Sequence, residues 1–70
     1  MSNTYTAVTQ RSGEWWIGWI EEIPGVNCQE RSREELLASL QEALGEMIEL
    51  NREDARSRAE PGFAEESISA

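Results

Sequence analysis

Short segments with strand-like composition come first in this chain, and a long segment with helical spacing follows them. Residues 4–10, TYTAVTQ, are rich in β-branched and aromatic side chains, which favour strands. Ser12 and Gly13 follow, and these residue types are typical of a hairpin turn. We therefore predict a first strand over about residues 4–11 and then a tight turn.

The second apolar segment, residues 14–22 with the sequence EWWIGWIEE, predicts a strand that is apolar on both sides. Side chains alternate at a period of two along a strand, so neither side is clearly suited to solvent. One side carries Trp15, Ile17 and Trp19, and the other carries Trp16, Gly18 and Ile20.

A proline–glycine pair interrupts the chain after this strand. Pro24 fixes its own φ angle and biases Ile23 toward extended geometry, while Gly25 supplies a permissive turn position. The sequence VNCQE then allows the chain to return. We predict a corner in which Pro24 and Gly25 are structural, and a third strand over about residues 26–30.

A helix start is the clearest local signal. Ser32 and Glu35 have the spacing of a capping box, in which the serine hydroxyl accepts from a free backbone N–H and the glutamate reaches back to the cap residue. The helix is expected over about residues 33–53. Apolar residues recur at steps of three and four and form one stripe, with acidic residues on roughly the opposite side. The stripe contains Leu36, Leu37, Leu40, Ala43, Leu44, Met47 and Ile48, and the acidic band contains Glu35, Glu42, Glu46, Glu49 and Glu53.

The tail, residues 54–70, has few large apolar side chains. A short fourth strand over about residues 66–69 is possible there, and a right-handed return would place it parallel to the first strand. The economical arrangement of these elements is an antiparallel β-β-β meander with the helix across one face. We therefore predict a single α+β domain over residues 1–70.

One helix covers only one face of such a sheet, so large apolar side chains remain on the other. We expect Gly18 to face the helix, because its missing side chain permits close approach, and Trp15 and Trp19 to lie on the open face. Exposed aromatic patches mark association surfaces, and a chain of this length buries only about 60% of its unfolded surface. Self-association through Trp15, Ile17 and Trp19 is therefore predicted, with a purely core role of the tryptophans as the alternative.

Charge narrows the choice of partner. The chain has 14 acidic residues against six arginines, no lysine and no histidine, for a formal net charge of −8. Such a chain repels phosphate backbones, so we expect no direct binding to nucleic acid and favour a basic protein partner. The acidic band of the helix is either the partner's binding site or a solvated face.

The residues offer little for catalysis. Without histidine no Ser-His-Asp or Cys-His arrangement can form, and the single cysteine, Cys28, allows neither an internal disulfide nor a zinc motif. Asp54 is the only aspartate, and the first strand carries no acidic residue, so two-metal nuclease chemistry is not expected. We predict no enzyme activity, no cofactor and no metal. The N-terminus lacks the apolar core of a signal peptide and no apolar run approaches about 20 residues, which predicts a cytoplasmic protein without a membrane span.

The succession of a strand around Tyr5, the stretch EWWIGWIEEIPGV and the helix start SREELLASLQEAL resembles the HicB family of antitoxins. The resemblance covers about residues 5–55. It implies a partial RNase H-like fold of order β-β-β-α-β and a partner toxin of the HicA type, a small basic ribonuclease that the antitoxin covers. Longer members add a C-terminal DNA-binding segment, which we do not expect within these 70 residues.

The resemblance also implies a mechanism. The protein would neutralise a HicA-type toxin by occluding its RNA-binding surface, with the carboxylates of Glu42, Glu46 and Glu49 lying where the toxin would hold RNA phosphates. The alternative is a solitary HicB-like homo-oligomeric interaction protein that has no cognate toxin. A neighbouring reading frame for a small basic protein would favour the first function, and its absence would favour the second.

Overall fold

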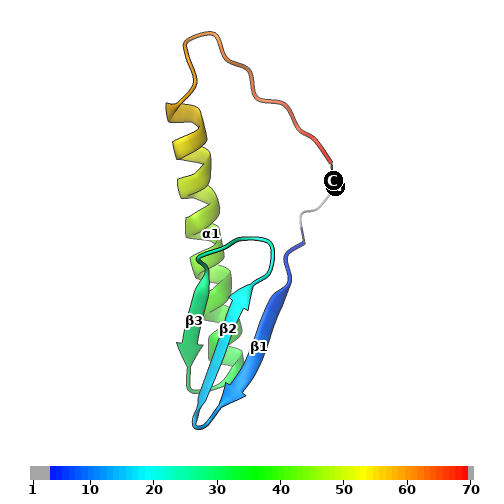
Figure 1. The fold of residues 1–70 in the computed structure, drawn as a ribbon, viewed down its shortest axis with the longest axis vertical. Helices are drawn as coiled ribbons and strands as arrows, with labels where there is room; N and C mark the ends of the chain where they lie inside the picture. Colours follow the sequence, from blue (N-terminus) through cyan, green and yellow to red (C-terminus); the bar gives the residue numbers. More distant parts are fainter. Residues whose placement is uncertain (1–3, 70) are drawn as a thin grey trace.

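Three antiparallel strands and one long helix make up the fold (Figure 1). The computed structural model describes residues 4–69. The elements are β1 (Ala7–Ser12), β2 (Trp15–Ile20), β3 (Asn27–Glu30) and α1 (Arg33–Ser57). The sheet order is β1-β2-β3, so the α+β class and the antiparallel meander are confirmed. Residues 1–3 and 70, which the predicted domain included, lie outside the described residues.

The β1–β2 hairpin turns through Gly13 and Glu14, while Ser12 pairs with Trp15. The prediction placed Ser12 in the turn, whereas the structure keeps it in β1 as the last paired residue. Gly13 has φ +62°, a conformation that glycine adopts at little cost and that a two-residue hairpin loop requires at its first position. The turn therefore closes without strain.

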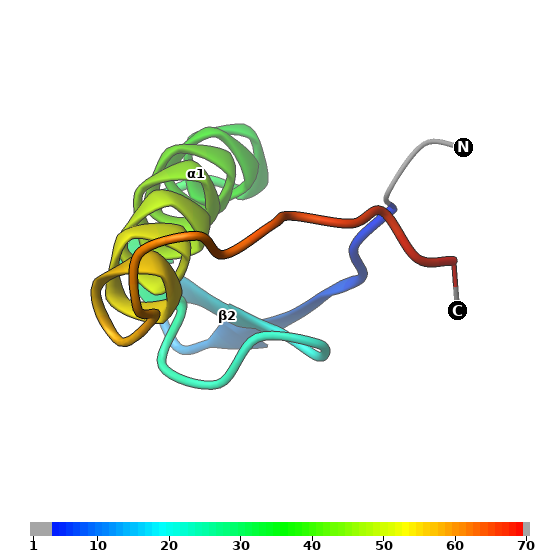
Figure 2. The ribbon, with the colours of Figure 1, turned by 90° about the horizontal axis from the view of Figure 1, so that it is seen from above.

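Helix α1 lies on one side of the sheet and leaves the other side uncovered (Figure 2). It packs over β2 and β3 more than over β1. The fully buried part of the resulting core is small, and half-buried side chains such as Tyr5, Trp16 and Met47 surround it. The buried residues are Ile20, Val26, Leu36 and Leu40.

Gly18 sets the distance between helix and sheet. A Cβ atom at this position would lie 2.8 Å from the carbonyl oxygen of Val8 and 3.1 Å from methyl carbons of both Leu36 and Leu40. Those leucines are the most buried residues of α1, so the helix approaches the sheet where a side chain is missing. The prediction that Gly18 faces the helix is confirmed.

The start of α1 is fixed by a side-chain cap. The Ser32 hydroxyl accepts a hydrogen bond from the Glu35 backbone N–H at 3.1 Å and donates to the Glu35 carboxylate at 3.0 Å. The predicted cap is confirmed, and the glutamate reaches back to the serine side chain. One turn further on, the Ser39 hydroxyl donates to the Glu30 carboxylate at 2.7 Å, which ties α1 to the end of β3.

The corner between β2 and β3 follows the prediction for its glycine. Gly25 has φ +91°, and the Ile20 backbone N–H donates to the Val26 carbonyl at 3.1 Å across the corner. Toward the β1 edge of the sheet, the Thr6 backbone N–H donates to the Glu22 carboxylate at 2.8 Å. The corner is thus bonded to the residues that precede β1.

The C-terminal third of the chain differs from the prediction. Helix α1 continues to Ser57 rather than to about residue 53, because no proline or glycine lies between residue 53 and Pro61, and helical hydrogen bonding persists without an apolar stripe. The possible strand over residues 66–69 is absent from the structure, in which residues 63–69 have no regular secondary structure. Within the expected strand, residues 66–69, Ile68 is the only large apolar residue and is 94% exposed, so pairing would bury almost nothing. The partial RNase H-like relationship stays a prediction.

Candidate functional site

The uncovered face of the sheet carries the first candidate surface, which we call the open face. Alternation along β2 places Trp15, Ile17 and Trp19 there, opposite the side that contains Gly18. Trp15 is 37% exposed and Trp19 is 40% exposed, while Ile17 is half-buried. Three large apolar side chains of the central strand therefore share one solvent-facing surface.

The neighbouring strands complete the open face in rows across the sheet. Val8, Trp19 and Asn27 form one row, and Gln10, Ile17 and Gln29 form the next. In the third row Ser12 pairs with Trp15. Apart from Val8, the neighbours of the apolar centre in these rows are uncharged polar side chains, an arrangement typical of protein interfaces.

Arg31 adds a cation to one end of the open face. Its guanidinium carbon lies 4.4 Å from the centroid of the Trp15 ring, a distance at which the cation is attracted to the ring face. The three rows contain no carboxylate; Glu14 and Glu21 flank β2 at its two ends, and Glu30, which follows Gln29, lies on the helix side, where it accepts a hydrogen bond from Ser39. In a chain of net charge −8, this face is therefore distinct in charge as well as in hydrophobicity.

The acidic band of α1 is the second candidate surface. Glu42, Glu46 and Glu49 are all exposed, on the side of the helix away from the buried Leu36 and Leu40. Among the described residues, neither Glu42 nor Glu46 takes part in an ion pair. Glu49 lies 3.6 Å from a guanidinium nitrogen of Arg56, so its charge is partly compensated within the chain.

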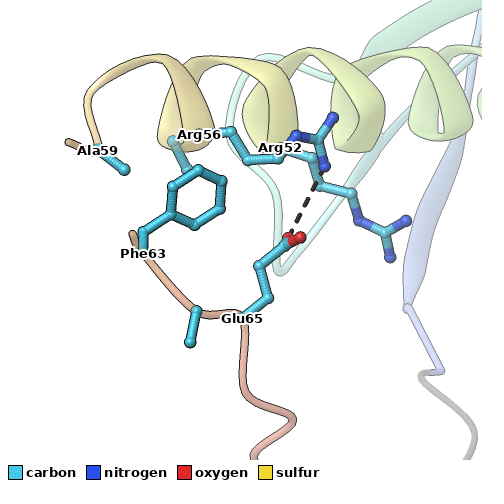
Figure 3. A pocket seen from close by; sticks show the side chains of 7 residues that line it. Arg52, Arg56, Ala59, Phe63 and Glu65 are labelled. Carbon is cyan, nitrogen blue, oxygen red and sulfur yellow. Dashed lines mark ion pairs between the residues drawn. The ribbon is translucent and has the colours of Figure 1, made fainter. Parts of the chain in front are cut away.

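Sequence reasoning missed a third feature, a shallow hollow at the C-terminal end of α1 (Figure 3). Arg56 lies at its edge and is 3.8 Å from the Glu65 carboxylate, while Phe63 contributes its ring from the tail. The spacing of Arg52 and Arg56, one helical turn apart, and the single phenylalanine after Pro61 were the signals available in the sequence. The hollow of about 270 Å³ is lined by Arg52, Ala55, Arg56, Ala59, Phe63, Ala64 and Glu65.

The structure offers no support for chemistry at Cys28. Its side chain is half-buried on the helix side of β3, and both this burial and the nearby Glu30 carboxylate raise the pKa of the thiol. A thiol held in its protonated form is a poor nucleophile. Within residues 4–69, no group of three or more potential ligand side chains is placed to hold a metal ion.

Membrane-spanning potential and similarity to known proteins complete the description. No helix in the described part of the chain is both long enough and apolar enough to cross a membrane. No family model, curated protein or solved structure matches the sequence or the fold.

Proposed function

We propose that this chain is an antitoxin-like binding protein, without catalytic activity, that neutralises a small basic ribonuclease of the HicA type by covering its RNA-binding surface. The observation that carries the proposal is the exposure of Glu42 and Glu46 one turn apart on a helix docked to the sheet. Lysine and arginine side chains that hold RNA phosphates also bind carboxylates through charge-assisted hydrogen bonds. Such a surface can compete directly with RNA.

The small free energy of exposed ion pairs determines which rate constant the acidic band should affect. An exposed ion pair contributes only about 0.2 to 1 kcal/mol, so the acidic band adds little to the lifetime of a complex. It acts mainly on the association rate and on partner choice, while apolar contacts set residence time. Glu49 contributes less than Glu42 and Glu46, because Arg56 already lies beside it.

The test pairs this chain with the product of a neighbouring reading frame that encodes a small basic protein. Association is measured at about 50 mM and 300 mM NaCl, a range over which screening of exposed charges changes strongly. Glu42→Lys combined with Glu46→Lys should slow association at low salt by about tenfold or more, and the difference should shrink at high salt. Adding Glu49→Lys should slow it only slightly further. RNA cleavage by the partner should be inhibited by the wild-type chain and less by these variants.

A matched control is available in the tail. Glu60→Lys combined with Glu66→Lys changes the net charge by the same amount at exposed residues outside the helix. This control should retain most of the wild-type association rate. If the Glu42 and Glu46 variant folds and associates as fast as the wild type at low salt, the acidic band is a solvated face and the proposal is wrong.

A second candidate function follows from the open face. A solitary interaction protein that assembles only with itself would need an apolar, uncharged surface and no basic partner, and Trp15, Ile17 and Trp19 supply such a surface. Failure of every small basic neighbour to bind, together with self-association of the purified chain, would favour this function over toxin neutralisation.

A further inference from the structure

We infer that the open face binds a second copy of this chain, sheet against sheet, with the two β2 strands antiparallel. The inference concerns self-assembly and does not depend on the toxin-neutralising function. Its starting point is the exposure of Trp15 and Trp19 beside Ile17 on a face that α1 leaves uncovered. Aromatic residues and arginine are also the residue types that dominate interface energetics, and Arg31 stacks on Trp15.

Charge favours another copy over a basic protein as the occupant. The rows of the open face carry no carboxylate, although the chain has 14 acidic residues, so this face has little to attract a basic partner. Face-to-face packing of two sheets places both α1 helices on the outer sides, with two sheets about 10 Å apart between them. The acidic bands, which point away from the sheets, then lie farther apart than the Debye length of about 8 Å at physiological salt.

The ends of the open face determine the orientation. Arg31 lies at the Trp15 end. Glu21 follows β2 directly at the Trp19 end, where its backbone N–H still bonds to the Thr6 carbonyl at 2.9 Å. A two-fold axis across the strands at Ile17 brings the Arg31 end of one copy to the Glu21 end of the other. An axis along the strands would instead place the two Glu21 residues of the central strands together, where they repel.

The size of the face sets the strength of the dimer. Two strands of six residues and one of four cover at most roughly 14 by 20 Å, a flat area of about 280 Å², which is well below the about 800 Å² per partner of a stable complex. The dimer should therefore form and dissociate at micromolar concentrations. It would bury both exposed tryptophans of each copy and expose two acidic helices on opposite sides.

Sedimentation of the purified full chain tests this inference without any other protein. A small interface is half-occupied at a protein concentration between about 5 and 500 μM. Over this range the sedimenting mass should rise from that of the 7.9 kDa monomer toward twice that value. Trp19→Ser should weaken association at least tenfold. Leu50→Ser, which removes another exposed apolar side chain on the far half of α1, should leave association unchanged. Circular dichroism verifies that each variant is folded.

A charge exchange tests the orientation. Arg31→Glu and Glu21→Arg should each weaken the dimer severalfold, because like charges then meet at the two ends of the interface. The two changes together should restore most of the lost association, because opposite charges meet there again. A chain that stays monomeric over the whole range overturns the inference. The inference is also overturned if Leu50→Ser abolishes the dimer while Trp19→Ser leaves it intact. Failure of the double exchange to recover association overturns the antiparallel arrangement.

Discussion

At the scale of single residues, two glycines of identical chemistry have opposite roles. Gly18 lies between the Val8 carbonyl and the methyl groups of two buried leucines, so the space for a side chain is already occupied. Gly45 lies on the exposed side of α1, and a Cβ there would meet nothing within 4 Å. The first is required by packing, and the second only weakens the helix.

Gly18→Ala should therefore destabilise the protein by about 1 to 3 kcal/mol, because one of the clashing atoms belongs to the backbone and cannot move aside. Gly45→Ala should stabilise it by about 0.5 to 1 kcal/mol, since alanine is the better helix former. Urea unfolding of the two variants measures both values. Equal effects of the two changes would contradict the close approach of α1 to β2.

At Gly25, the expected cost of a substitution comes from backbone conformation rather than from a lack of space for the side chain. Its φ of +91° strains a β-branched residue, whereas the nearest atom to a new Cβ, the terminal methyl carbon of Met47, is at an ordinary 3.7 Å. Gly25→Val should cost at least about 1 kcal/mol. A synthetic chain with Gly25→D-Ala serves as the control, because a D-residue prefers positive φ and should keep the wild-type melting temperature. Wild-type stability of the valine variant would show that the corner adopts another conformation.

At the scale of elements, Glu22 connects the β2–β3 corner to the residues before β1. Its carboxylate accepts the Thr6 backbone N–H at 2.8 Å, and this hydrogen bond lowers the pKa of Glu22 below its ordinary value. A lowered folded-state pKa means that the contribution to stability is present above the unfolded-state pKa. It is lost as the pH falls through the folded-state pKa.

Glu22→Gln removes the titrating group while keeping a similar shape. The difference in unfolding free energy between wild type and variant should be constant near neutral pH and should shrink as the pH falls below the ordinary glutamate value of 4.5. Urea unfolding at several pH values measures it. A difference that grows on acidification would mean that Glu22 is not bonded as a carboxylate.

At the scale of the whole molecule, excess negative charge opposes compactness. The chain has 14 acidic residues and six arginines, and two of those arginines, Arg56 and Arg58, account for the three ion pairs within residues 4–69. The remaining carboxylates repel one another with little internal compensation. Screening by salt should relieve this repulsion.

The melting temperature should therefore rise as NaCl increases from about 20 mM to 300 mM, over which the Debye length falls severalfold. The variant that combines Glu42→Lys and Glu46→Lys should show a smaller rise, because it removes part of the repulsion within the acidic band. Thermal unfolding followed by circular dichroism at low protein concentration separates this effect from dimer formation. A melting temperature independent of salt would show that the charges are too far apart to matter.

The sequence by itself determined the local elements and the two faces of β2. Alternation of side chains is a geometric property of any strand, and the cap at Ser32 depends on residues only three positions apart, so both could be inferred without coordinates. The positive φ at Gly25 was foreseeable for the same reason, because turn chemistry is local. The acidic side of α1 also followed directly from helical periodicity.

Only the tertiary structure decided which residues distant in the sequence come into contact. The absence of a fourth strand depends on whether Ile68 finds a partner surface. The stacking of Arg31 on Trp15 joins residues from β2 and the end of β3, which alternation alone does not bring together. Local rules specify conformations a few residues long, whereas these contacts depend on the packing of distant segments around a small core, and that packing left the tryptophan face open.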